Sequence, residues 1–471
     1  MNYFLFKEIS RCSNSILKNK INYFKVSLTS LHIIRSHKNY FNLSRRKSNN
    51  SNSFFRIFKR YYLISDNYFK KKINSDFLFI SNFVNKSELN VKDRFFDPII
   101  EQLESKNIKY NIIYRNLSDY NNNLKFKKNN LIILNESSKI FNDIYYFFKI
   151  FLEIIKIFFY RDNIKFNIKE KIIKNLFTFK NITSSLSNIN HVNNIMYLVK
   201  KLNPKKVFIT YEGYPWERML CRKLKDYNPK IKIFGYYFSV ITKYTNTPLV
   251  KFRKNFDPDF ILTSSEFISE IFKKKGFKKE NIFNFGSKKK RKSVSTYQKK
   301  KNLINCLILP ESFDDETKYL IDFAKKIDDL KIGIKFILKL HPSVQNDFYI
   351  NQLKLYIDKN NIEISKNSLA EDIKRSHLAF YRGSSSIIEA SSQNVIPIFI
   401  PNKNELSIDV LYKLEKVKPK INNINDFVKF FKIYKKNNFN IHTYNETKII
   451  NFCKNYYSQI DKKIINQIIK M

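Results

Sequence analysis

The stretch that decides the fold is Arg-Gly-Ser-Ser-Ser-Ile-Ile-Glu, residues 382–389. A short apolar strand is predicted over 378–381, a helix from about Ser385, and a second strand over 395–400. Strand, glycine turn, helix and strand in this order place three hydroxyls and free backbone N–H groups at a helix N-terminus. In a doubly wound α/β sheet this position holds a phosphate. The sequence therefore predicts a phosphate site, made by Gly383, Ser384, Ser385 and Ser386.

A second motif, Lys339-Leu340-His341-Pro342, closes another predicted strand over 333–340. It places an imidazole at the same kind of sheet edge, so the two motifs together predict a nucleotide pocket. Each has a purely structural alternative. Ser386 and Glu389 have the spacing of a capping box, and a histidine followed by Pro342 can simply end a strand. Their occurrence in order, on successive strands, favours the nucleotide pocket.

Apolar runs of strand length alternate with helical patterns along most of the chain. Such alternation predicts parallel, doubly wound sheets. The expected fold class is therefore α/β, with two facing, doubly wound Rossmann-type domains and a C-terminal helix that packs back. Besides the strands named above, the predicted strands are 76–82, 110–114, 131–134, 206–210, 231–237, 260–263 and 304–310.

Changes in composition suggest the domain boundaries. A run of Lys, Arg, Ser and Gln has almost nothing to bury, so it is interpreted as a linker. The expected organisation is a basic, partly disordered polar leader (1–72), an N-terminal Rossmann-like acceptor domain (73–287), the linker (288–302), a C-terminal Rossmann-like nucleotide-binding domain (303–440) and a C-terminal helix (441–471).

The formal net charge of +46 does not predict a nucleic-acid partner. Of the 87 basic residues, 15 are arginine and 72 are lysine, whereas recognition of bases and phosphates favours arginine. The abundance of Lys, Asn, Ile, Phe and Tyr matches an A/T-rich coding sequence. The charge remains compatible with an anionic membrane surface or anionic substrates.

Cysteine usage and the first residues predict a cytoplasmic protein. The four cysteines show no paired spacing, so neither a disulfide framework nor a zinc site is expected. The N-terminus lacks the pattern of a secretory signal, although residues 1–72 also loosely fit an organelle transit peptide. Residues 144–160 are mostly apolar, with Lys149, Glu153 and Lys156 on one helix face. They predict a buried or interfacial helix, and so at most peripheral contact with the inner face of the plasma membrane.

An acid-glycine turn, Thr210-Tyr211-Glu212-Gly213, follows the predicted strand over 206–210. The order of this turn, the His-Pro motif and the serine motif resembles GT-B glycosyltransferases that use cytidine nucleotides, such as sialyl-, polysialyl- and Kdo transferases. The resemblance covers roughly residues 76–415. It implies that His341 and residues 384–386 hold the nucleotide phosphate, that Glu389 holds the ribose hydroxyls and that Glu212 is the general base. Tyr211 departs from the acid that these families carry before the base.

The resemblance implies transfer of a sugar from a CMP-linked donor to a surface-polysaccharide or glycolipid acceptor. Such transfer needs a base for the acceptor hydroxyl and donors for the departing phosphate. Asp257-Pro258-Asp259 has the spacing of a metal motif but precedes a strand, so neither a metal nor a cofactor is expected. Glu217 is a reserve candidate for the base. Two questions stay open: whether Glu212 instead pairs with Arg218 or Arg222, and whether Trp216 stacks on sugar or lies in the core.

Two other functions remain in view. A similar pair of motifs occurs in teichoic-acid-type transferases, which move a polyol phosphate from a CDP carrier. These often show a Gln-His pair after a first-domain strand, where this chain reads Tyr-Tyr-Phe-Ser over 236–239. The third hypothesis is a non-catalytic, membrane-surface assembly protein built on a transferase fold.

Overall fold

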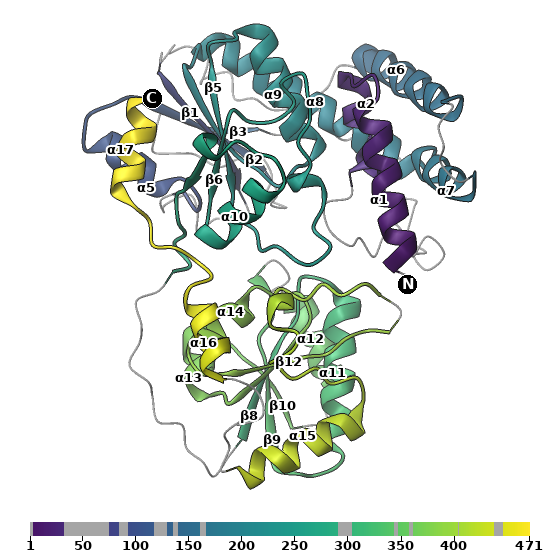
Figure 1. Ribbon diagram of the computed structural model, residues 1–471, viewed down its shortest axis with the longest axis vertical. Helices are drawn as coiled ribbons and strands as arrows, with labels where there is room; N and C mark the ends of the chain where they lie inside the picture. Colours follow the sequence, from purple (N-terminus) through teal and green to yellow (C-terminus); the bar gives the residue numbers. More distant parts are fainter. Residues whose placement is uncertain are drawn as a thin grey trace. The chain divides into compact units, whose positions relative to one another are not determined.

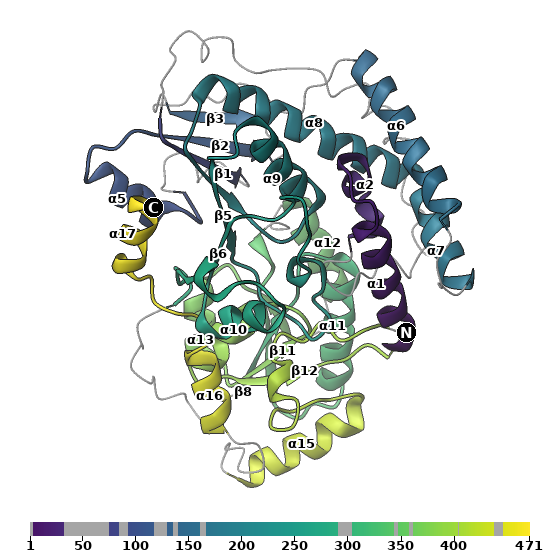
Figure 2. The same cartoon turned by 45° about the horizontal axis from the view of Figure 1, so that its top comes forward.

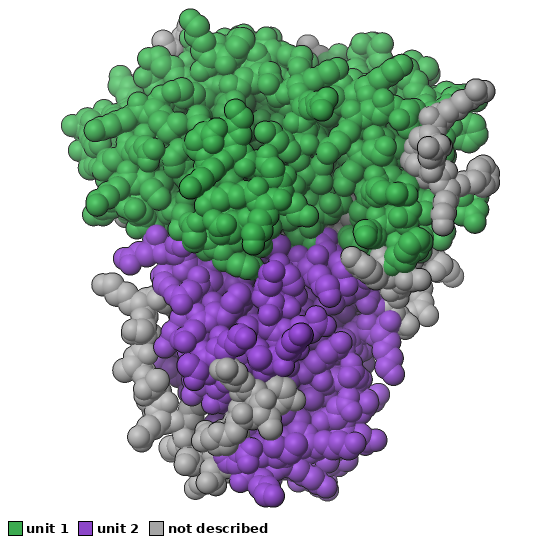
Figure 3. Space-filling model, in the orientation of Figure 1, with its two compact units in different colours: residues 1–239, 245–286, 460–471 green, residues 240–244, 287–459 purple. Residues whose placement is uncertain are grey.

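The computed structural model describes most of the chain, which divides into two compact units (Figure 3). Unit 1 comprises Met1–Ser239, Thr245–Gly286 and Ile460–Met471, and unit 2 comprises Val240–Tyr244 and Ser287–Gln459. The described residues are 3–32, 75–83, 93–116, 130–134, 140–160, 166–290, 304–342, 347–357, 361–403, 405–437 and 446–471.

The described part of unit 1 is built on a seven-stranded parallel sheet in the order β3-β2-β1-β4-β5-β6-β7 (Figure 1). A row of four phenylalanines crosses the centre of this sheet. The four residues are paired in register on neighbouring strands: Phe79, Phe208, Phe234 and Phe260. Their ring centroids lie 4.7–4.9 Å apart. The strands are β1 (Phe77–Phe83), β2 (Tyr110–Asn116), β3 (Leu131–Leu134), β4 (Lys206–Thr210), β5 (Lys232–Tyr237), β6 (Phe260–Thr263) and β7 (Ile282–Asn284).

The helices of unit 1 include a group near the N-terminus that the sequence did not predict. Residues 3–32 form α1, α2 and a 3-10 turn, and Leu17, Val26 and Leu31 in them are fully buried. This part of the expected polar leader is therefore folded, while residues 33–74 lie outside the described residues. The helices are α1 (Tyr3–Lys18), α2 (Tyr23–Ser27), α5 (Asp97–Glu104), α6 (Ile140–Phe158), α7 (Phe166–Leu176), α8 (Phe179–Leu202), α9 (Pro215–Tyr227), α10 (Glu266–Lys274) and α17 (Lys462–Lys470).

The C-terminal segment forms two helices that belong to different units. Helix α16 (Glu446–Lys454) is part of unit 2, and α17 is part of unit 1. In α17, Ile465, Ile468 and Ile469 join the same hydrophobic core as Phe79 and Phe208. The expectation that a C-terminal helix packs back is confirmed for α17, whose apolar face covers unit 1.

The described part of unit 2 holds a five-stranded parallel sheet in the order β10-β9-β8-β11-β12. The strands are β8 (Ile304–Leu309), β9 (Ile334–Leu338), β10 (Ile362–Ile364), β11 (Leu378–Tyr381) and β12 (Ile396–Phe399). The helices, besides α16, are α11 (Asp314–Asp328), α12 (Asp347–Ile357), α13 (Leu369–Arg375), α14 (Ser386–Ser392) and α15 (Ile424–Lys436). The linker expected over 288–302 falls largely outside the described residues.

Both sheets are doubly wound, which confirms the predicted fold class. In each, the chain builds outward on one side of a central strand and then crosses to the other side. The crossover leaves a switch point between β1 and β4 in unit 1 and between β8 and β11 in unit 2. Ligands of open α/β sheets bind at the carboxyl ends of the strands beside such points. In the described part of the chain, no helix combines the length and apolar character needed to cross a membrane.

Candidate functional site

The predicted base, Glu212, follows β4 directly and therefore lies at the switch point of unit 1. Its side chain is half-buried. Oε1 of Glu212 accepts a hydrogen bond from the Ser239 hydroxyl, which follows the neighbouring strand β5. The two side chains meet because the carboxyl ends of parallel strands share one sheet edge. In the sequence, Ser239 was noted only because residues 236–239 lack the Gln-His pair of teichoic-acid-type transferases. Its contact with Glu212 was not predicted.

Glu217 accepts hydrogen bonds from the backbone of the turn that carries Glu212. Its side chain is too buried to reach an acceptor hydroxyl. Its carboxyl is 1% exposed, and Oε2 accepts hydrogen bonds from the backbone N–H of Glu212 (2.9 Å) and of Tyr214 (2.8 Å). Burial and then the charge of Glu212 raise the pKa of Glu217 well above its usual range, against those backbone hydrogen bonds. The reserve assignment of the base to Glu217 is therefore not favoured by its burial.

Gly213 lets the chain turn where a side chain would not fit. Its φ is +79°, and a Cβ atom there would lie 2.8 Å from backbone atoms of Pro248. The Pro248 segment is held by the buried Arg218, whose Nη2 donates to the carbonyls of Thr247 (2.7 Å) and Val250 (3.0 Å). The close approach of two backbones thus fixes the turn that presents Glu212.

The arginines proposed as structural partners of Glu212 have other partners. Arg218 forms a buried ion pair with Asp257, which also accepts from the Tyr211 hydroxyl at 3.1 Å. Arg222 pairs with Asp226 at 2.7 Å. Pairing of Glu212 with either arginine was therefore the wrong alternative. Tyr211, which stands where the families that the sequence resembles carry an acid, is fully buried beside this ion pair.

Trp216 belongs to the core, which settles the second open question. The side chain is 3% exposed. His191 of α8 meets it edge-on with ring centroids 5.1 Å apart, and the Arg115 guanidinium lies 5.7 Å from its ring centre. A buried indole offers no stacking surface to a sugar, so Trp216 joins α9 to α8.

In unit 2, two segments pack closely at the switch point. Gly383 follows β11 and faces Glu311, which follows β8. A Cβ atom on Gly383 would lie 2.4 Å from Oε1 of Glu311 and 2.7 Å from Cδ1 of Ile408. Any other residue at this position would require the side chains of Glu311 and Ile408 to shift. Glu311 was not predicted from the sequence, although its place after the first strand of a doubly wound sheet is a usable signal.

The serine motif lies on this edge as predicted, and a lysine accompanies it. Helix α14 begins at Ser386 with Ser385 at its N-cap, and the Ser385 side chain makes no capping hydrogen bond. Ser386 and Glu389 are therefore the first and fourth helical residues, so the capping-box alternative is wrong. The Lys289 ammonium lies 3.4 Å from the Ser385 hydroxyl. Ser384 is buried, and Ser385, Ser386 and Glu389 are half-buried.

His341 and Pro342 are exposed beyond the carboxyl end of β9. Strand β8 separates β9 from β11, so the His-Pro and serine motifs flank Glu311 across two strand spacings, about 10 Å. Both motifs are thus brought to one edge of the unit 2 sheet. Their contact with a nucleotide stays a prediction.

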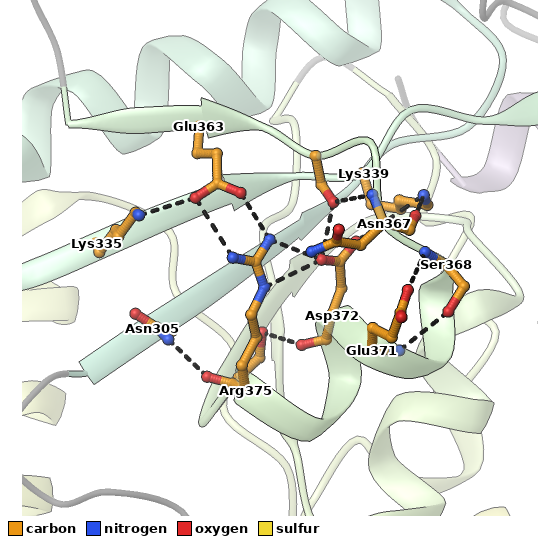
Figure 4. Close-up of polar contacts among 11 residues, drawn as sticks. Asn305, Lys335, Lys339, Glu363, Asn367, Ser368, Glu371, Asp372 and Arg375 are labelled. Atoms are coloured by element: carbon orange, nitrogen blue, oxygen red, sulfur yellow. Dashed lines mark hydrogen bonds and ion pairs between the residues drawn. The ribbon is translucent and has the colours of Figure 1, made fainter.

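A polar network fixes the turn that carries His341 (Figure 4). Lys339 donates to the Asn367 carbonyl and lies 3.9 Å from the fully buried Asp372. Asp372 accepts from the Ser365 hydroxyl (2.8 Å) and from Arg375 (2.8 Å). Arg375 bridges to Glu363 of β10 at 2.7 Å. These charged hydrogen bonds tie β9, β10 and α13 together through Lys339, two residues before His341.

Arg382, the first residue of the 382–389 stretch, is buried beneath the loop that carries the serine motif. It is 2% exposed and donates from Nη2 to Glu405 Oε2 at 2.7 Å. Its guanidinium also lies 5.2 Å from the ring centre of Tyr319. This pairing could not be predicted from the sequence, because Glu405 lies in an irregular segment after β12.

Asp257 and Asp259, which have the spacing of a metal motif, both interact with other residues of unit 1. Asp257 pairs with Arg218, and Asp259 accepts from the backbone N–H of Ile233 (2.9 Å) and pairs with Lys225 (2.7 Å). Within the described ranges, no group of three or more His, Cys, Asp or Glu side chains is placed to hold a metal ion.

No protein-family model matches the chain, and no curated protein matches it. Solved structures of similar fold include UDP-GlcNAc 2-epimerase from Methanocaldococcus jannaschii in complex with UDP-GlcNAc and UDP, at 13% identity and a TM-score of 0.47, covering 84% of this chain and 98% of that chain. Another is MurG from Acinetobacter baumannii, at 10% identity and 0.44, covering 84% and 100%. A third is the lipopolysaccharide outer core galactosyltransferase WaaB, at 14% and 0.42, covering 84% and 99%. At these low identities and TM-scores, the likenesses carry no inference about activity.

Proposed function

We propose that the chain is a glycosyltransferase and that the edge of unit 2 binds the phosphate of a nucleotide sugar. The observation that carries this proposal is the position of the serine motif directly after β11, at the switch point of unit 2. Three hydroxyls follow the strand there, and the Lys289 ammonium lies 3.4 Å from that of Ser385. Hydroxyl and ammonium donors at such an edge suit an anion that gains charge as a bond breaks. His341 would add an imidazole, and Glu389 would receive the ribose hydroxyls.

The proposed reaction needs one proton acceptor and one departing phosphate. Glu212 takes the proton of the acceptor hydroxyl as that oxygen forms its bond to the anomeric carbon. The bond from the anomeric carbon to the phosphate oxygen breaks, and its electron pair leaves with the nucleotide. Lys289 and the serine hydroxyls stabilise the charge on that phosphate. The Ser239 hydrogen bond orients the carboxylate of Glu212, the group proposed to accept the proton.

The donor and acceptor follow from the sequence resemblance. We propose a CMP-linked sugar as donor, and a surface polysaccharide or glycolipid as acceptor. The nucleotide sugar is a co-substrate, and neither a resident cofactor nor a metal is part of the proposed mechanism. We further propose that the protein works in the cytoplasm, in peripheral contact with the anionic inner face of the plasma membrane.

Nucleotide binding tests the proposal directly. Thermal unfolding is followed in the presence of CMP, CDP, UDP and GDP, because a ligand at a hundred times its Kd adds about 2.7 kcal/mol of stability. CMP is expected to give the largest shift. Preference for CDP together with transfer of a polyol phosphate would instead identify the teichoic-type reaction. Binding without turnover of any donor would identify the non-catalytic alternative.

The double variant Ser385→Ala with Ser386→Ala tests the location. Each hydrogen bond to a charged group contributes about 1.5–3 kcal/mol, so the CMP-dependent shift should largely disappear. Ser391→Ala with Ser392→Ala, at the other end of α14, is the matched control and should keep the shift. If the first variant binds CMP as tightly as the parent protein, the phosphate site is elsewhere.

A further inference from the structure

Helix α6 has two faces of different character, and one of them packs inside unit 1. Ile150, Ile154 and Ile157 are buried on this inner face. The polar residues of the same face also have partners. Asp143 accepts from Asn190 (2.7 Å), and Glu153 accepts from Asn22 (3.0 Å). The inner face therefore anchors α6 to α2 and α8.

The opposite face presents large apolar side chains to the outside. The exposed fractions reach 81% for Phe141, 60% for Phe148 and 72% for Phe159. We call this surface the α6 aromatic face; its exposed residues are Phe141, Ile144, Tyr145, Phe147, Phe148, Phe151, Leu152, Phe158 and Phe159. Phe177, just after α7, extends it, with its ring centroid 5.9 Å from that of Phe151. Figures 1 and 2 show α6 and α7 at the edge of unit 1, beyond α1 and α2.

Basic side chains border this face. The Lys149 ammonium lies 5.4 Å from the Tyr145 ring centre, and the Lys156 side chain is 68% exposed. Lys171, Lys174 and Lys180 are exposed along α7 and the start of α8. Two of these five lysines have acidic partners: Lys156 pairs with the buried Glu153 at 2.8 Å, and Lys174 pairs with Glu170 of α7 at 2.5 Å. The five lysines outnumber these two carboxylates, so the border of the aromatic face has a net positive charge.

We propose that the α6 aromatic face docks unit 1 onto an anionic lipid bilayer, with α6 lying in the plane of the headgroups. An amphipathic helix with aromatic residues on one face and lysines beside them is the pattern of an interfacial helix. The rings would enter the boundary between headgroups and acyl chains, and the lysines would meet lipid phosphates. This inference rests on the membrane contact proposed above and names the surface that makes it.

A second copy of the chain is a less suitable occupant. A symmetric contact sets the same patch of two copies face to face, so each lysine border would meet its own image. Anionic headgroups instead neutralise these charges. Charge complementarity therefore favours lipid over self-association.

Vesicle flotation tests the inference with the full chain and no nucleotide. The protein is expected to float with vesicles of phosphatidylcholine and phosphatidylglycerol, and more weakly with phosphatidylcholine alone. The triple variant Phe141→Ser, Phe148→Ser, Phe159→Ser should lose binding about 100-fold or more, because each ring loses its apolar burial. Lys171→Glu, Lys174→Glu and Lys180→Glu together should remove the preference for phosphatidylglycerol.

The matched control is Phe348→Ser with Leu355→Ser, since these α12 side chains are 74% and 81% exposed but lie in unit 2. It should float like the parent protein. Failure of the parent protein to float, or unchanged flotation of the triple variant, would overturn the inference. Self-association without vesicles that the triple variant abolishes would assign the face to a second copy instead.

A fluorescent variant guards against a folding defect in the triple variant. Trp216 is the only tryptophan and is 3% exposed, so Phe148→Trp adds a distinguishable reporter on α6. Brominated phosphatidylcholine in the vesicles should quench the added tryptophan, and absence of quenching would contradict docking by this face. Nucleotide-dependent thermal shifts are measured without lipid, so the catalytic proposal and the docking inference can fail separately.

Discussion

Glu212 is the single residue on which the proposed chemistry depends most. Glu212→Gln keeps the size and the acceptor for the Ser239 hydrogen bond but cannot take a proton. Sugar transfer should fall by about 10²–10⁴-fold. The affinity for CMP should be nearly unchanged, because the proposed nucleotide residues belong to unit 2. Transfer rate and CMP binding are measured on the same preparation.

Ser239→Ala is the companion to this variant. It keeps the carboxylate of Glu212 and removes only the hydroxyl that orients it, so we expect a loss of about tenfold, in line with one ordinary hydrogen bond. A full rate in Glu212→Gln would show that the base is another residue. A full rate in Ser239→Ala alone would show that the hydrogen bond does not position the base.

The turn between β4 and α9 is the element that presents Glu212, and its geometry predicts unequal costs for two glycine substitutions. Gly276→Ala meets no atom within 4 Å, so it bears only the strain of a φ of +87°, about 1–2 kcal/mol. Gly213→Ala bears similar strain, and its Cβ also meets the backbone of Pro248. It should cost about 1–3 kcal/mol more. Chemical denaturation of both variants measures the difference, and equal costs would mean that the Pro248 segment yields easily.

Stability of the whole molecule should fall in mild acid because two histidines are buried without charge. Burial, with Arg218 near one ring and Arg115 near the other, lowers the pKa of His32 and of His191 from 6.5 to about 3. Between these values the unfolded chain binds protons that the folded chain does not. Stability contributed by each histidine is therefore present above pH 6.5 and is lost as the pH falls, by about 1.4 kcal/mol per pH unit.

Urea unfolding at several pH values between neutral and mildly acidic measures this slope. In His191→Gln, the change of unfolding free energy with pH should be smaller by the contribution of one histidine, about 1.4 kcal/mol per pH unit. This holds whatever the absolute stability of the variant. His341→Gln changes an exposed side chain and serves as the control. The same slope in His191→Gln and in the parent protein would show that His191 does not remain uncharged in the folded state.

The net charge of +46 also makes a prediction at this scale. Binding to duplex DNA should be weak, without sequence preference, and lost as salt rises, because lysine-rich surfaces contribute mainly the phosphate term. Fluorescence anisotropy with two unrelated duplexes over a range of salt concentrations measures it. Nanomolar, sequence-selective binding at physiological salt would contradict the assignment of a sugar substrate.

The sequence by itself determined most of the strands and the positions of the motifs along them, but it missed the two short strands β7 and β10. β3, β4 and β11 have the predicted bounds, because each is a short, mainly apolar run, and such runs are buried on both faces of a parallel sheet. The alternation of these strands with helices predicted parallel, doubly wound sheets, whereas the order of the strands in each sheet comes from the structure. The placement of Glu212 and of the serine motif at carboxyl strand ends needed nothing more.

Only the tertiary structure decided which side chains support these motifs. Ser239 beside Glu212, Glu311 beside Gly383 and Arg382 with Glu405 are pairs from segments far apart in sequence. Local periodicity carries no information about such contacts. The fold of residues 3–32 was missed for the same reason: their burial depends on α7 and α8, which lie more than a hundred residues later. The apolar residues of α6 were visible in the sequence, but the division into a packed face and an exposed face depends on the helices that cover one side.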